Sequence, residues 1–240
     1  MKHLFITLIM MLVTSMANAQ CPDKNHPHAI DLGLPSGTKW ACCNVGATTP
    51  EGFGNYYAWG ETKVKEKYDW ASYIHCDGTA ETCHDIGSDI AGTEYDVAHI
   101  QWGGSWVMPS QEQFKELIDK CSYTFVTRNG VDGGLFTGPN GGTIFLPEAL
   151  LRFNEFYECP MYEGYYWSST KNTSDRTYRL SFDNWAASWS ASELRGFGLT
   201  VRPVMSGISG QPVRGDIDGD GVVSIKDVME VIDIILTGKE

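Results

Sequence analysis

All eight Trp residues of this 240-residue chain lie before residue 206, and this boundary divides the chain into two unlike parts. Aromatic side chains supply much of the area that a domain buries, so a hydrophobic core is expected only before that point. The stretch 206–212 (SGISGQP) is small and uncharged, which is typical of a linker. We therefore expect one sizeable domain at 20–205, a linker at 206–213 and a separate tail at 214–240.

Residues 1–19 have the pattern of a secretory signal peptide. A basic start precedes an apolar run at 4–13, and Ala17-Asn18-Ala19 supplies the small residues of a cleavage site. The run is about half of the roughly 20 residues that a membrane-spanning helix needs, so no membrane span is expected. A lipid anchor on Cys21 is the alternative, but Gln20 is not the small residue that a lipoprotein signal requires. The sequence predicts a secreted protein that begins at Gln20 and is extracellular, at the cell surface or periplasmic.

The chain is acidic, with 30 Asp and Glu residues against 18 Lys and Arg residues and a formal net charge of -12. A surface of this sign repels phosphate backbones and anionic lipid, so nucleic acid is not expected as a partner. Divalent cations are favoured instead.

Carboxylates in the tail follow the spacing of a calcium-binding loop of the EF-hand type. Calcium takes six to eight oxygen ligands, and such a loop supplies them around a glycine that allows a sharp turn. The expected ligands are carboxylates, one backbone carbonyl and one hydroxyl, from Asp216, Asp218, Asp220, Val222, Ser224 and Asp227. The predicted cofactor is therefore Ca2+. The alternative, an acidic turn without metal, would leave four carboxylates repelling one another.

One helix is expected beside this loop. The residues before the loop contain three Gly and a Pro, whereas apolar residues recur at helical spacing from Ile225 to Leu236. This loop and helix, over Arg214 to Leu236, resemble a dockerin type I repeat, which implies a cohesin-like partner. A full dockerin has two such repeats and one is present here, so a second copy of this chain is the alternative partner.

Seven cysteines follow the signal segment, and an oxidising destination favours disulfides over metal clusters. Cys76 and Cys83 are the most local pair, each beside a histidine, His75 and His84. A disulfide that closes this short loop is expected. The alternative is a His/Cys metal site, although such ligands usually come as two close pairs separated by a longer span. The adjacent pair Cys42–Cys43 is expected in a strand, where the two side chains would point to opposite faces and one would be buried.

The domain at 20–205 is expected to be α+β with many loops. Ser110 and Gln113 form a capping box after Pro109, and apolar residues then recur at helical spacing, which predicts a helix at Gln111–Cys121. Short alternating or aromatic runs between Gly, Asn and Pro predict strands. These runs are Thr143–Leu146, Tyr165–Thr170, Thr177–Phe182, Ala186–Ser190 and Leu199–Val204.

Seven short motifs follow one another between His28 and Met205. They are DLGLPSGTKW (31–40), CNVGA (43–47), YAWGET (57–62), WGGSWVMP (102–109), TGPNGGTIFLP (137–147), YWSST (166–170) and VRPV (201–204). Together they resemble the Fibrobacter succinogenes major paralogous domain, which is common in secreted proteins of gut Bacteroidetes. The resemblance implies a C-type-lectin-like fold shared with formylglycine-generating enzymes. The copper-binding cysteine pair of those enzymes has no counterpart between Tyr165 and Val204, so their activity is not expected.

Aromatic residues crowd the segment 165–189, where Ser, Asn and Arg separate them. Aromatic faces stack on sugars and anchor protein interfaces. Tyr165, Trp185 and Trp189 are therefore predicted to form a ligand-binding face. The alternative is that these side chains fill the core.

Motifs of nucleophilic hydrolases, zinc proteases and nucleotide-binding proteins are not found in the sequence. We therefore expect a secreted binding or surface-interaction protein, with a glycan or protein ligand and without catalysis. One alternative is a polysaccharide-degrading enzyme or an accessory component of a glycan-degrading complex. Another is a structural protein that dimerises through the tail.

The calcium assignment predicts that titration calorimetry of the secreted chain will show one bound ion. Asp216→Ala or Asp227→Ala will abolish the binding, because each substitution removes a charged ligand from a small coordination shell. Failure of the wild type to bind millimolar calcium, or wild-type binding by both variants, would contradict the assignment.

Overall fold

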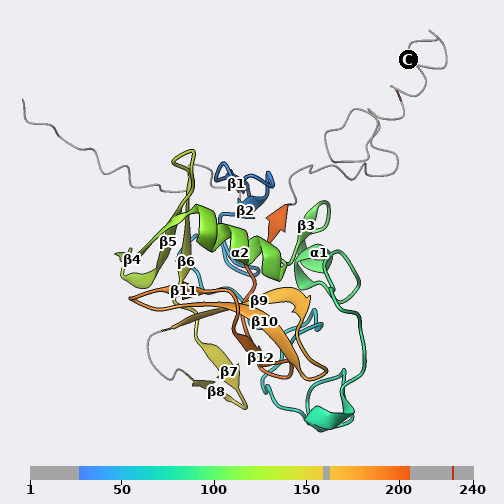
Figure 1. The fold of residues 1–240 in the computed structure, drawn as a ribbon. Helices are drawn as coiled ribbons and strands as arrows, with labels where there is room; N and C mark the ends of the chain where they lie inside the picture. The colour runs from blue at the N-terminus through green and yellow to red at the C-terminus, as the bar shows by residue number, and fades with distance from the viewer. Residues whose placement is uncertain (1–26, 159–162, 206–228, 230–240) are drawn as a thin grey trace, which may run out of the picture.

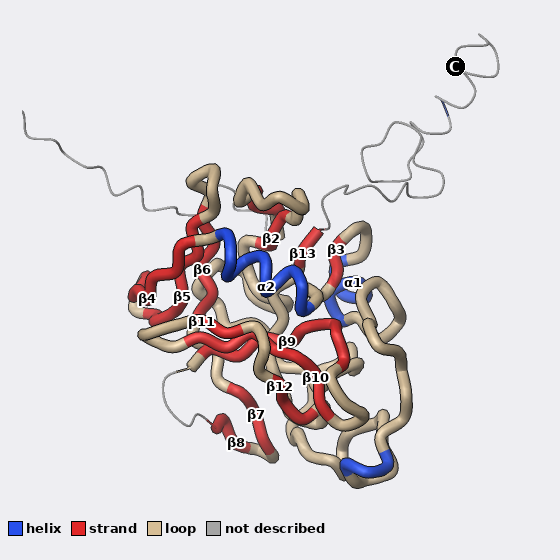
Figure 2. Tube along the Cα trace, viewed as in Figure 1, coloured by secondary structure: helices blue, strands red, loops and turns tan. Residues whose placement is uncertain are grey.

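The computed structural model describes residues 27–158, 163–205 and Met229 (Figure 1). Short antiparallel strands outnumber helices among these residues, and long loops connect them (Figure 2). The fold is α+β and rich in sheet, as the sequence predicts at this level. The same residues contain no helix long and apolar enough to cross a membrane.

The first sheet joins the two ends of the described domain. Strand β1 (Ala29–Asp31) pairs with β2 (Lys39–Ala41), β2 pairs with β13 (Val204–Met205), and β13 pairs with β3 (Trp106–Val107). All these pairings are antiparallel. Residues 29–41 therefore lie beside the last strand, although more than 160 positions separate them in the sequence.

The second sheet is centred on β10 (Arg176–Phe182). Strand β9 (Gly164–Lys171) pairs along one edge of β10, while β11 (Ala187–Ser188) and β12 (Ser192–Leu194) pair with the two ends of its other edge. The strands predicted at 165–170 and 177–182 are confirmed within a residue or two. The strand predicted at 186–190 is shorter than expected.

Two further sheets are built from consecutive strands. The larger contains β4 (Ser122–Arg128), β5 (Val131–Thr137) and β6 (Thr143–Pro147), so the strand predicted at 143–146 is confirmed. The smaller is a hairpin of β7 (Leu151–Phe153) and β8 (Phe156–Glu158). Asn129-Gly130 turns β4 into β5 with φ values of 50° and 80°, the left-handed conformation that this dipeptide accepts in tight hairpins.

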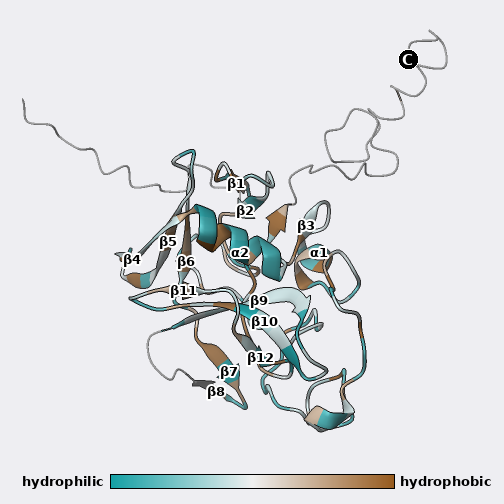
Figure 3. Cartoon of the chain, in the orientation of Figure 1, coloured by the Kyte–Doolittle hydropathy of each residue, from teal (hydrophilic) through white to brown (hydrophobic). Residues whose placement is uncertain are grey.

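Helix α2 (Gln111–Lys120) confirms the predicted capping box. The Ser110 hydroxyl accepts from the Gln113 N–H at 3.2 Å, and the Gln113 side chain accepts from the Ser110 N–H at 2.9 Å. Phe114 and Leu117 are buried beneath the helix, whose hydrophilic side faces outward (Figure 3). The N-cap and the apolar spacing thus decide the position of this helix.

Helix α1 (Val97–Trp102) and the 3-10 turn η1 (Ala80–Thr82) were not expected. The buried Asp96 carboxylate caps α1 and accepts from four backbone N–H groups, those of Gly92, Ala98, His99 and Met108. Burial raises the pKa of Asp96, and these four donors oppose the rise. The Asp96 side chain thereby links the chain before α1 to the chain after it.

Two sequence predictions about strands are wrong in part. The predicted strand Leu199–Val204 is interrupted: Leu199 and Thr200 form isolated bridges to Tyr57 and Tyr166, and only Val204 enters β13. Arg202 turns into the core between them, and Pro203 has no N–H to donate. The strand predicted through the pair Cys42–Cys43 ends at Ala41, where the chain bends. Both cysteines are buried, so they do not point to opposite environments.

Two large clusters of buried side chains form the core. One packs α2 against the sheets of β4–β6 and β9–β10, with Trp40, Phe114, Phe136 and Phe182 at its centre. The other lies beneath α1, β9 and the loops before η1, with Trp59, Trp167, Tyr165 and Leu199 among its members. A third, smaller cluster gathers Tyr56, Tyr68 and Tyr73 with Cys76.

Candidate functional site

Trp185 stands on the tight turn between β10 and β11, and its side chain is 85% exposed. The Asp183 Oδ1 atom accepts from the N–H groups of Trp185 at 2.7 Å and Ala186 at 2.8 Å. The Asp183 N–H donates to the Ala186 carbonyl at 3.0 Å, and the Tyr123 hydroxyl donates to the Asp183 carbonyl. Four hydrogen bonds therefore hold the backbone from which an exposed indole projects.

The other two residues predicted for the ligand face have different environments. Tyr165 is only 2% exposed and belongs to the second core cluster, so its assignment to an exposed face is wrong. Residues of β9 are buried on both faces from Gly164 to Ser169, so this strand presents no exposed aromatic face there. The Arg179 guanidinium lies 4.4 Å from the Tyr165 ring and helps to cover it.

Trp189 lies just after β11 and is partly buried against the first core cluster. The Lys115 Nζ atom on α2 lies 5.6 Å from the centre of its ring. Trp185 and Trp189 do not share one strand face, because a turn rather than a strand contains Trp185. The structure thus leaves Trp185 as the exposed member of the predicted trio.

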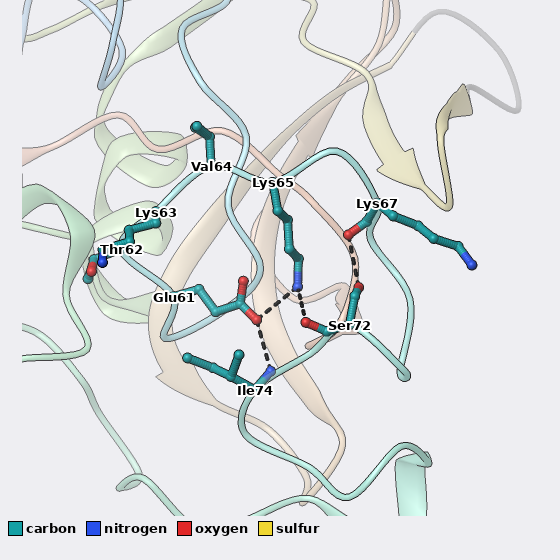
Figure 4. A pocket seen from close by; sticks show the side chains of 8 residues that line it. All are labelled: Glu61, Thr62, Lys63, Val64, Lys65, Lys67, Ser72 and Ile74. Carbon is teal, nitrogen blue, oxygen red and sulfur yellow. Dashed lines mark hydrogen bonds and ion pairs between the residues drawn. The ribbon is translucent and has the colours of Figure 1, made fainter.

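A groove of about 490 Å³ lies along the loop at 61–74 (Figure 4). The side chain of Lys65 reaches across the groove, where its Nζ donates to Glu61 Oε1 at 2.8 Å and to the Ser72 carbonyl at 3.0 Å. Glu61 Oε1 also accepts from the Ile74 N–H at 3.1 Å. The sequence reasoning missed this site, whose only local signal is the alternating basic run Lys63-Val64-Lys65-Glu66-Lys67.

The two local cysteines lie opposite each other. The backbones of Cys76 and Cys83 form an isolated antiparallel bridge. Both cysteines carry free thiols in this structure, and the two thiols contact each other. Burial raises the pKa of the Cys83 thiol, and contact with Cys76 raises it further. This pairing of the two backbones is compatible with the predicted disulfide between Cys76 and Cys83, which an oxidising environment would favour.

The neighbouring histidines bind other groups. His75 Nε2 is 3.0 Å from the Gly60 carbonyl, and burial lowers the pKa of this imidazole. His84 Nε2 is 3.1 Å from Asp77 Oδ1. Within the part of the chain that the structure describes, no three His, Cys, Asp or Glu side chains gather to hold a metal ion. The predicted calcium ligands between Asp216 and Asp227 lie outside that part.

Comparisons of the chain with protein-family models, with curated proteins and with solved structures find no match. Among the described residues, the Trp185 turn and the groove at 61–74 are the two features that suit a ligand.

Peptide mapping of the secreted chain without reduction will find Cys76 joined to Cys83. Closing this short loop is expected to add about 2.5 kcal/mol to the free energy of unfolding. Reduction should therefore lower wild-type stability by about that much more than it lowers the stability of a Cys76→Ser/Cys83→Ser variant. Both thiols reacting with an alkylating agent before reduction would contradict the pairing.

Proposed function

We propose that this chain is a secreted binding protein, with a C-type-lectin-like domain at 20–205 that binds a glycan and a calcium-stabilised docking tail at 214–240. The observation that carries the binding role is the presentation of Trp185. Single exposed apolar residues are common on protein surfaces, but this indole also projects from a turn whose backbone is fixed by hydrogen bonds from and to Asp183. A rigid, flat and partly apolar surface is what stacking on a sugar ring requires.

The packing of the other aromatic residues supports this choice. Tyr165 and Trp167 are buried, and Trp189 is partly covered, so the core is filled without Trp185. The turn is held before any ligand arrives, because Asp183 and Tyr123 already bind its backbone. Little conformational entropy is then lost when the indole is covered.

The chemistry of the turn favours binding over catalysis. Asp183 is the carboxylate of the turn, and its Oδ1 atom already accepts two backbone hydrogen bonds. The role of this side chain is to shape the turn. We therefore propose retention of an intact glycan, and the polysaccharide-degrading alternative becomes an outcome of the test.

The proposed role of the tail rests on the donor set in the sequence. Carboxylates, a carbonyl and a hydroxyl are the hard oxygen ligands that calcium prefers, and their spacing suits the ion. Calcium would order the loop and present the apolar helix that follows to a cohesin-like partner or to a second copy of the chain. Ligand binding by the domain is independent of this site in the proposal.

A glycan array probed with the chain from Gln20 to Glu240 tests the domain. Trp185→Ala is expected to weaken retention of the bound glycan by about tenfold or more, as for an aromatic residue at the centre of an interface. Its melting temperature should stay near that of wild type, because the indole contributes little to the core. Calcium chelation should leave retention unchanged.

Phe156→Ala is the matched control, since Phe156 is also exposed but lies on the β7–β8 hairpin. Its binding should equal that of wild type. Equal loss in both variants, or no loss in Trp185→Ala, would sink the assignment of Trp185. Release of shortened glycan products from the array would support the enzyme alternative instead.

A further inference from the structure

The groove at 61–74 is separate in sequence from both the Trp185 turn and the tail. A second depression of about 360 Å³ adjoins it and shares Val64 and Lys65. Binding sites for small ligands usually have volumes of this order and combine apolar walls with a few placed polar groups. The residues that line the main groove are Glu61, Thr62, Lys63, Val64, Lys65, Lys67, Ser72 and Ile74.

The floor of the groove is held in place before any ligand binds. Glu61 is buried, and the ion pair between Lys65 and Glu61 is mostly shielded from solvent. The Lys65 Nζ atom also lies 5.4 Å from the Tyr68 ring centre and 5.7 Å from the Tyr73 ring centre, where the ring faces attract the cation. Both tyrosines are buried, so their rings help to fix the position of the Lys65 side chain.

Glu61 lines the groove and has one carboxylate oxygen to spare. Its Oε1 atom binds Lys65 and Ile74, whereas Oε2 accepts no bond from the residues drawn in Figure 4. A carboxylate oxygen in this position accepts hydrogen bonds, so it suits a ligand with hydroxyl or N–H groups.

The walls of the groove are positively charged, in contrast to the chain as a whole. The two depressions are lined by four basic side chains and two carboxylates in a chain of net charge -12, although Asp69 and Glu155 offset part of this positive charge at Lys67. The side chains of Lys63 and Lys67 extend in opposite directions, on either side of Lys65 (Figure 4). Lys67 pairs with Asp69 at 2.7 Å, but an ion pair with a half-exposed lysine is weak and leaves it available to a ligand.

Two aliphatic side chains form apolar edges. Val64 is 58% exposed and Ile74 is 68% exposed, and both line the groove. Their surfaces suit the C–H faces of sugar rings. A ligand that matches the whole groove has apolar faces, hydroxyl donors for Glu61, and negative charges spaced along its length for the outward lysines.

We propose that the groove binds an acidic oligosaccharide, a chain of sugars that carry carboxylates. Lys63 and Lys67 contact carboxylates at the two sides, Glu61 accepts from a hydroxyl group, and Val64 and Ile74 pack on ring faces. An acidic peptide also offers carboxylates for the lysines and backbone N–H donors for Glu61, but it lacks the C–H ring faces that suit Val64 and Ile74.

Titration calorimetry with trigalacturonate and its methyl ester tests the proposal, since the two probes differ in charge. The chain from Gln20 to Glu240 should bind the acid and should bind the ester at least several-fold more weakly. Affinity for the acid should fall as salt is raised. A Lys63→Gln/Lys67→Gln variant should bind the acid about five- to tenfold more weakly, the size expected for losing two exposed ion pairs.

A Lys39→Gln/Lys120→Gln variant is the matched control. It removes the same charge at exposed positions on β2 and at the end of α2, and its affinity for the acid should equal that of wild type. Trp185→Ala should also leave this affinity unchanged, so failure here and failure of the proposed function are separate results.

Four outcomes would overturn the proposal. The first is absence of binding to trigalacturonate, and the second is equal binding of acid and ester. The third is tighter binding of a hexaglutamate peptide than of trigalacturonate, which would make the groove a peptide site. Equal losses of affinity in the two double-lysine variants would also count against it, because the effect would then come from overall charge.

Discussion

The buried Arg202 guanidinium is the interaction on which the arrangement of the domain depends most. It is fully shielded from solvent and donates to Asn44 Oδ1 at 2.7 Å, to the Ala41 carbonyl at 3.0 Å and to the Phe145 carbonyl at 2.9 Å. A buried arginine is tolerated only when its donors are satisfied, and loop carbonyls inside a protein need donors. One side chain meets both requirements and ties the first sheet to β6.

The same solution recurs through the aromatic residues. A domain with long loops and short strands needs other links between its segments, and the polar ends of several buried Trp and Tyr side chains donate to backbone carbonyls of distant segments. Donors of this kind are Trp59 to Ser168, Trp167 to Tyr57, Tyr68 to Tyr56, Tyr73 to Trp59 and Tyr166 to Pro147, with lengths of 2.5 to 2.9 Å. The high aromatic content is therefore first a structural property. It also explains why an exposed Trp185 stands apart from the rest.

The sequence predicted those features that depend on local rules. Helix α2 follows from its capping box, and strands β6, β9 and β10 follow from their apolar runs. The burial of Tyr165 was not predictable from alternation, because it depends on which loops cover the second face of β9. The groove was missed for a similar reason, since the link from Lys65 to Glu61 and the underlying Tyr73 depends on how a loop folds back. Trp185 was identified because a surplus of aromatic residues is visible in the sequence alone.

Amide hydrogen exchange of the unliganded chain tests most directly whether buried side chains hold the loops. The N–H groups of Val45, Asn55 and Tyr57 lie in loops, yet they donate to backbone carbonyls beside the Arg202 and Trp167 contacts. These amides are expected to exchange nearly as slowly as those of β9 and β10, because they open only with the core. The substitution Arg202→Met should raise the exchange rates of all three amides together. Fast exchange of the three amides in the wild type, while β9 and β10 remain protected, would contradict the account.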